Sequence, residues 1–196
     1  MTQTELTLDR PDISTTAGNL NLGDTATIDR KDNLAPQALA VLRILLGTVF
    51  LWAFVDKSFG FGFATPAATS WIAGGSPTKG YLGHLEGWFA GPFSALAGNP
   101  LVDVLFMGGL LLLGVALILG VGLRVAAAGG TLLMLLMWLT ALPLQNNPVI
   151  DEHVIYAAAM IALATTKAGE TWGLGRQWEA VLQKAPWRMS KSVGWT

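Results

Sequence analysis

The feature that most constrains this chain is a long middle segment with almost no charge. Residues 33–166 cover 134 positions and hold only nine acidic or basic side chains, against sixteen in the two shorter ends. An ordinary soluble domain has about a quarter of its residues charged, whereas this chain has 13% and is 52% hydrophobic. The middle segment is too apolar to fold in water, and we expect it to lie in a membrane.

Composition also excludes several classes of protein. The chain has no cysteine, which rules out disulfides, iron–sulfur clusters, thiolate metal sites and cysteine nucleophiles. Its net charge is −1 and it has no run of basic residues, so nucleic acid is not an expected partner. The N-terminus is polar and predicts no cleavable signal peptide.

Four apolar stretches predict four membrane-spanning helices, and the expected fold is all-α, an integral membrane four-helix bundle. We place the stretches at residues 37–55, 101–123, 125–142 and 150–168. Pro36 suits the first turn of the first helix. The fourth stretch is marginal, because only 13 residues separate His153 from Lys167. Small residues at four-residue spacing predict close helix packing, within the bundle or against a partner subunit.

Basic side chains gather at one end of the predicted spans and most acidic ones at the other. Arg124, Lys167 and the basic residues of both tails fall on the first side, whereas Glu86, Asp151 and Glu152 fall on the opposite side. By the positive-inside rule, we expect a multi-pass protein of the cell (inner or plasma) membrane with both termini in the cytoplasm. The lipid bilayer is then its first partner.

The segments at the two ends predict tails of different kinds. Residues 1–35 are polar and are expected to be disordered alone or held by a partner. Residues 36–169 form the predicted membrane domain, and residues 170–196 a cytoplasmic tail. In that tail, apolar residues at helical spacing predict an amphipathic surface helix: Leu174, Trp178, Val181, Leu182 and Ala185.

The long outer loop, residues 58–99, is aromatic rather than polar. We therefore expect it to lie in the membrane interface, where aromatic belts are common. Within the loop, Tyr81, Leu85, Trp88 and Phe89 would share one face of a helix. This stripe predicts one short interfacial helix.

Arg43 is the charged residue that lies deepest in a predicted span, about two turns from its cytoplasmic end. Ionisable residues at such depth are functional candidates by default. The guanidinium can bind a lipid phosphate, a quinone headgroup or a carboxylate such as that of Glu170. It can equally extend to the interface and fix the depth of the helix. Arg43 is thus the candidate quinone- or lipid-binding residue.

The other candidates for chemistry lie on the outer side. Lys57 ends the first span and can attract an anion. The fourth span begins with Asp151, Glu152 and His153, which can accept and donate protons. The two carboxylates equally suit a helix N-terminus, where negative charge is stabilised. A bis-histidine haem with His84 is not expected, because the two histidines lie on different outer elements. No ligand spacing predicts a metal site.

Several short patterns follow one another along the four predicted spans. They are Arg43, Gly47 and Lys57; residues 71–77; Gly91-Pro92-Phe93 with Asn99-Pro100; residues 120–124; and residues 146–153 followed by Tyr156-Ala157. In these patterns and their order, the chain resembles the DoxX/DoxD family of small four-span membrane proteins, which includes subunits of thiosulfate:quinone oxidoreductase. The resemblance covers roughly residues 39–178 and leaves the N-terminal tail outside.

The resemblance implies a membrane protein of quinone-linked or sulfur redox metabolism that works beside other subunits, with quinone as the implied ligand. Because this chain has no cysteine and no recognisable cofactor site, we expect an accessory subunit of a multi-subunit respiratory or redox complex, without a covalently bound cofactor. The alternative is the catalytic subunit of a thiosulfate:quinone-type oxidoreductase acting with a second chain. In that case Lys57, Asp151, Glu152 and His153 would be catalytic. The low charge of the second and third spans argues against a transporter.

Overall fold

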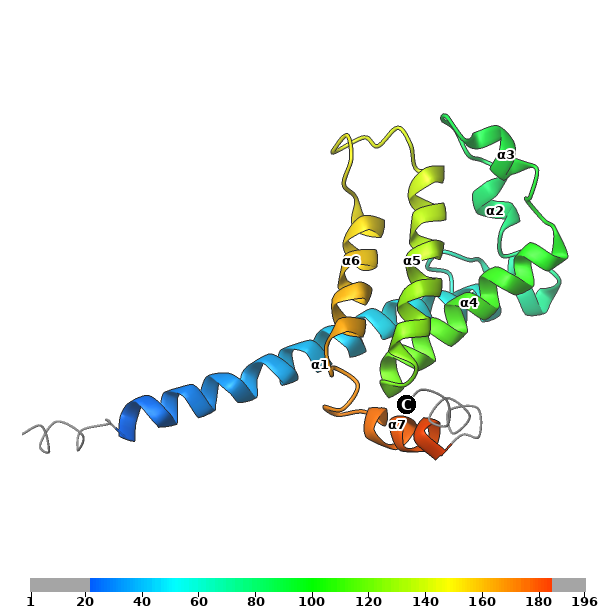
Figure 1. Ribbon diagram of the computed structural model, residues 1–196. Coiled ribbons are helices and arrows are strands. Elements are labelled where there is room, and N and C mark those ends of the chain that lie inside the picture. Colours follow the sequence, from blue (N-terminus) through cyan, green and yellow to red (C-terminus); the bar gives the residue numbers. More distant parts are fainter. Residues whose placement is uncertain (1–21, 185–196) are drawn as a thin grey trace, which may run out of the picture. The chain divides into compact units, whose positions relative to one another are not determined.

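The computed structural model describes residues 22–184, with side chains from residue 34 onward, and every regular element in this part of the chain is a helix (Figure 1). The longer helices are α1 (Leu22–Phe59), α4 (Pro100–Leu119), α5 (Leu123–Thr140), α6 (Glu152–Thr165) and α7 (Gly175–Lys184). The chain divides into two units, residues 1–35 and 36–196, and of the first unit only residues 22–35 are described. The predicted all-helical class is confirmed for the described residues.

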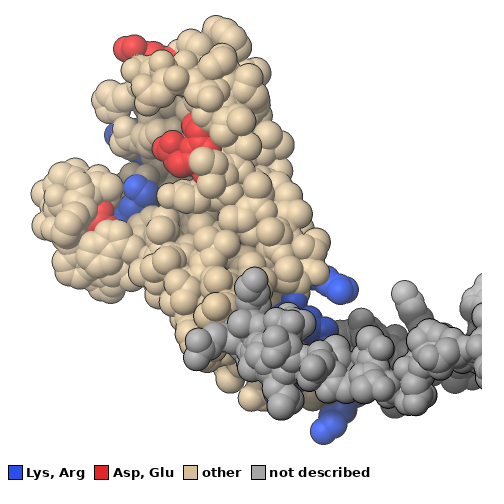
Figure 2. Space-filling view, turned by 90° about the vertical axis from the view of Figure 1, so that its left-hand side faces the viewer, with Lys and Arg blue, Asp and Glu red and all other residues tan. Residues whose placement is uncertain are grey.

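Three helices are long and apolar enough to cross a membrane: the part of α1 from Leu34 to Phe59, α4 and α5. Many of their large apolar side chains face outward; Leu112 is 70% exposed and Val125 79%. The face shown in Figure 2 is accordingly uncharged over most of its area. These helices make the chain a membrane protein. Helix α6 is apolar but has only 14 residues, about 21 Å of helix, against roughly 30 Å of hydrocarbon.

The helix ends differ from the predicted ones for identifiable reasons. Helix α4 stops at Leu119, four residues before the predicted end, because Gly120 adopts a left-handed conformation with φ 71° and the amide of Val121 bonds back to the carbonyl of Ala116. Helix α1 begins at Leu22 rather than at residue 37, so Pro36 lies inside it and not at its start. The division between the two units coincides with this proline, whose ring removes one backbone hydrogen bond.

Glycines bring the membrane helices into close contact. A Cβ on Gly47 of α1 would lie 2.9 Å from the backbone nitrogen of Ile118, and a Cβ on Gly114 of α4 would lie 2.8 Å from that of Leu51. Only residues without side chains allow α1 and α4 to cross at this separation. Helix α5 packs against both α4 and α6, with Gly130 directly against the sulfur of Met160.

The outer segment contains two α-helices, α2 (Lys79–Leu82) and α3 (Ala90–Ser94), and not the one predicted helix that begins at Tyr81. The prediction failed because Gly87 has φ 130°, a conformation that interrupts any helix. The segment covers the end of α5 (Figure 1): the hydroxyl groups of Tyr81 and Thr140 are 2.8 Å apart, and the amide of Trp88 donates to the carbonyl of Leu142 at 3.3 Å.

Candidate functional site

Arg43 lies on the buried face of α1 and its side chain is wholly enclosed, with 0% exposure. Its guanidinium donates to the carbonyl oxygens of Leu117 and Ile118, the latter at 2.6 Å. It also donates to those of Thr171 at 3.2 Å and Trp172 at 3.1 Å. The first two belong to the last turn of α4, which carries the negative end of the helix dipole. The Leu117 carbonyl also accepts from the amide of Gly120 at 3.2 Å. Arg43 thus joins α1, α4 and the segment after α6.

Glycine backbone surrounds the Arg43 guanidinium closely. A Cβ on Gly120 would lie 2.9 Å from one terminal nitrogen of Arg43, and a Cβ on Gly173 3.1 Å from the other. The amide of Leu174 donates to the carbonyl of Leu119 at 2.8 Å, which ties the same two segments together. Both terminal nitrogens of Arg43 are thus occupied by backbone carbonyls, whereas its buried Nε has no hydrogen-bond partner among the described residues. A lipid or quinone headgroup at Arg43 would have to replace one of these carbonyls or reach the enclosed Nε.

Glu170, considered above as a carboxylate partner for Arg43, forms other ion pairs. One of its oxygens lies 3.7 Å from the Lys167 amine and the other accepts from Arg176 at 3.3 Å. Arg43 bonds instead to carbonyl groups, two of them in the last turn of α4. A notch of about 280 Å³ lies beside this network, between Leu39 of α1 and residues 167–176.

On the outer side, Asp56 is 2% exposed and holds the beginning of the outer segment. Its carboxylate accepts from the amides of Ala64 at 2.9 Å and Phe63 at 3.4 Å. Lys57 next to it is half-buried, and within the described residues no carboxylate approaches its amine within 4.0 Å. Asp56 is thus a structural acceptor, whereas Lys57, like Lys79 in the outer segment, forms no ion pair among the described residues.

Asp103 holds a different part of the outer segment. It lies in the first turn of α4, is 6% exposed, and accepts from the hydroxyl of Ser76 at 2.9 Å and the amide of Thr78 at 3.1 Å. The amide of Gly98 in turn donates to the Thr78 hydroxyl at 3.3 Å. Asp103 therefore fixes both ends of residues 76–98. The sequence carried no signal for Ser76 and Thr78 as partners of Asp103.

Asp151 is the N-cap of α6 and precedes the helix by one residue. Its carboxylate accepts from the amides of His153 at 3.1 Å and Val154 at 3.3 Å, and its second oxygen lies 2.7 Å from the imidazole Nδ1 of His153. Burial alone would raise the pKa of Asp151, but the hydrogen bonds from His153 and Val154 outweigh it and leave that pKa below its ordinary value. Glu152 is exposed.

The polar residues predicted to converge on the outer side thus divide among separate contacts. Asp56, Asp103 and Asp151 each bind a different segment, and no hydrogen bond or ion pair within the described residues joins Lys57 to the Asp151–His153 pair. His84 is exposed, with its Nδ1 3.0 Å from the carbonyl of Gly80. In the part of the chain that the structure describes, no three histidines or carboxylates come together as a metal site would need.

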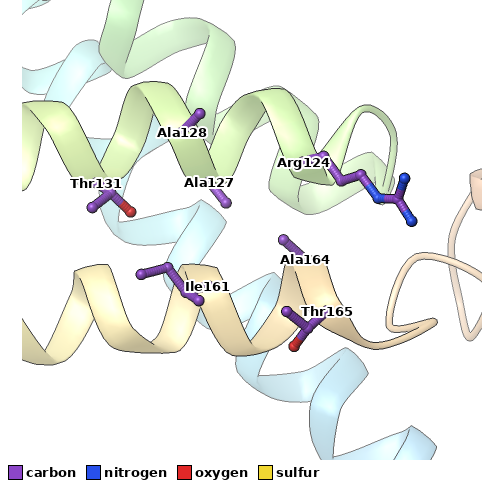
Figure 3. Close-up of a pocket in the computed structure, with 7 residues that line it drawn as sticks. All are labelled: Arg124, Ala127, Ala128, Thr131, Ile161, Ala164 and Thr165. Carbon is purple, nitrogen blue, oxygen red and sulfur yellow. The ribbon is translucent and has the colours of Figure 1, made fainter.

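A groove of about 690 Å³ lies between α5 and α6, and sequence reasoning recognised its small residues only as packing surfaces (Figure 3). Arg124 lies at one end and Thr131 toward the other. Between them the lining is Ala127, Ala128, Ile161, Ala164 and Thr165. The groove is therefore mainly apolar, with two threonine hydroxyls, of which that of Thr131 has no hydrogen-bond partner among the described residues, and one cation at an end.

Comparison of the chain with protein-family models, with curated proteins and with solved structures finds no match.

Proposed function

We propose that this chain is a membrane-embedded accessory subunit of a multi-subunit respiratory or redox complex and carries no redox cofactor itself. The strongest support comes from Arg43, whose two terminal nitrogens donate hydrogen bonds to four backbone carbonyls. Asp56, Asp103 and Asp151 are likewise engaged in holding loops and a helix end. These four charged groups thus stabilise the fold, which leaves them unavailable for chemistry.

The redox setting comes from the resemblance to DoxX/DoxD proteins, and the structure is compatible with it. Three apolar helices place the chain in the bilayer, where quinones dissolve. An accessory role requires surface for other subunits, and the outward-facing apolar residues of α1, α4 and α5 provide it. Quinone is the ligand that this setting makes available. The membrane is the inner or plasma membrane, with both termini in the cytoplasm.

The proposed architecture is a four-span bundle with α6 as its fourth member. Helix α6 packs along α5, and its 14 residues are extended by the segments on either side of the helix. Helix α7 then lies at the cytoplasmic surface with its apolar face toward the lipid. The exposure of Val181, at 63%, and Trp178, at 41%, supports this placement. The tail residues 185–196, including Ala185, lie outside the described residues.

The test is solubilisation of native membranes in a mild detergent, with a purification tag on the full chain. We expect stoichiometric recovery of larger membrane subunits whose visible absorption reveals redox cofactors. Recovery of the chain alone, folded and without partners, would contradict the proposal. The catalytic alternative would replace it if the purified chain reduced a quinone analogue with thiosulfate and Lys57→Ala or His153→Ala abolished that activity.

A further inference from the structure

The groove lies on the packed α5–α6 pair, and among the described residues none of the hydrogen bonds or ion pairs that hold the loops and helix ends crosses it. We propose that it binds an anionic phospholipid of the bilayer, with the lipid phosphate on Arg124 and an acyl chain along Ala127, Ala128 and Ala164. The proposal needs only that the chain resides in a membrane. It therefore holds or fails separately from the accessory-subunit proposal.

The groove opens toward the lipid and is large enough for a ligand. Its volume of about 690 Å³ is within the roughly 300–1,000 Å³ of typical ligand sites. The side chains beside it on both helices face outward, with Val125 79% exposed and Ile161 49%. In a bilayer, an apolar hollow at this position is filled either by lipid chains or by a neighbouring helix.

The position of Arg124 decides between these occupants. Arg124 is exposed at one end of the groove, and within the described residues no carboxylate lies within 4.0 Å of it (Figure 3). An arginine beside an apolar surface is best stabilised by an anion, and its planar fork matches a phosphate. A phospholipid brings the anion and the apolar chain in one molecule. A partner helix in the groove would need an acidic residue opposite Arg124 to supply the same anion.

The arrangement also matches a general pattern, in which basic pockets between membrane helices hold anionic lipid headgroups. The residues of α5 and α6 provide both the cation and the open space. Gly122 starts α5 two residues before Arg124, which places the cation in the first turn of the helix. The alanines of α5 and α6 then keep the space along the helix axes open.

The experiment uses the full chain, purified in detergent and stripped of lipid. Phosphatidylglycerol or phosphatidylcholine with identical acyl chains is added, and bound lipid is counted by native mass spectrometry. We expect the wild type to prefer phosphatidylglycerol. Arg124→Gln should weaken phosphatidylglycerol binding about fivefold and leave phosphatidylcholine unchanged, because one basic contact is lost. Lys184→Gln, which removes a cation outside the groove, should bind like the wild type.

Filling the groove tests the acyl-chain part of the site. Ala164→Leu should weaken binding of both lipids, whereas Val125→Leu, on the outward surface beside the groove, should not. If Ala164→Leu fails to fold, Ala128→Leu on the exposed rim replaces it. Unchanged lipid selectivity in Arg124→Gln would overturn the proposal. Release of a second copy or of a partner subunit by the filling variants, with lipid binding intact, would identify the groove as a helix interface and overturn it too.

Discussion

The guanidinium of Arg43 in α1 donates to the carbonyl oxygen of Ile118 in α4 at 2.6 Å, joining residues 75 positions apart. The same group binds the carbonyls of Thr171 and Trp172 beyond α6. One side chain thus links the first helix, the end of the second predicted span and the segment that leads to α7. Because the Arg43 side chain is wholly buried, its own charge would be left without a partner if these contacts were lost, so we expect the link to stabilise the fold.

We expect Arg43→Leu to lower the free energy of unfolding by about 1–3 kcal/mol, the usual cost of leaving a buried polar group unpaired. The contacts to Ile118, Thr171 and Trp172 are only partly buried, which limits the loss. Arg43→Lys should recover only part of this, because one ammonium cannot reach all four carbonyls. Thermal unfolding in detergent measures the stability of both variants. Arg176→Gln, at an exposed arginine, is the control and should change little. Wild-type stability in Arg43→Leu would show that the four contacts do not hold the fold.

Gly114→Ala should destabilise the protein by about 1–3 kcal/mol, because its Cβ would meet the backbone of Leu51 and push α1 from α4. Gly109→Ala in the same helix is the matched control. Its Cβ meets nothing within 4 Å, so the change should be neutral or stabilising. Thermal unfolding of the two variants should therefore move in different directions. Equal effects would mean that α1 and α4 do not cross at Gly114.

Asp103→Ala should release residues 76–98 from the first turn of α4, because the hydroxyl of Ser76 and the amide of Thr78 lose their shared acceptor. Hydrogen exchange followed by mass spectrometry should show faster exchange in this segment, with α5 and α6 unchanged. Glu86→Ala, at an exposed carboxylate of the same segment, should leave the exchange as in the wild type. Unchanged protection in Asp103→Ala would contradict the assigned contacts.

The lowered pKa of Asp151 predicts a pH-dependent contribution to stability. The ionised carboxylate is favoured in the folded protein, so its contribution is full above the ordinary aspartate pKa of about 3.9 and is lost as the pH falls through the lowered value. Asp151→Asn keeps a good N-cap but removes the charge. At pH 7 it should cost less than about 1 kcal/mol, and the difference from the wild type should vanish in strong acid. Glu152→Gln is the control; a difference that persists in acid would exclude this explanation.

Sequence alone was sufficient to predict the membrane class and three of the apolar helices, because hydropathy depends on composition over a whole segment. It failed where a single backbone conformation decides the outcome, as at Gly87, whose φ of 130° separates α2 from α3. It also did not predict that Pro36 lies within α1, since proline favours the first turn of a helix and costs about 3 kcal/mol in a helix interior.

The candidate site was predicted less completely. Residue type and depth singled out Arg43, but its partners are backbone carbonyls far along the chain. Such partners have no sequence signature. The groove at Arg124 needed the structure for a similar reason, because alanines on two helices become a hollow only when the helices are placed side by side.

The central claim is that the polar residues of this chain hold the fold while any redox chemistry belongs to its partners. The most direct measurement is quinone-analogue reduction by the purified assembly, per assembled complex, with Lys57, Glu152 and His153 each replaced by alanine. We predict rates within about twofold of the wild type. A loss of about 10²-fold or more in an intact assembly, which is the usual effect of removing a general acid or base, would contradict the account.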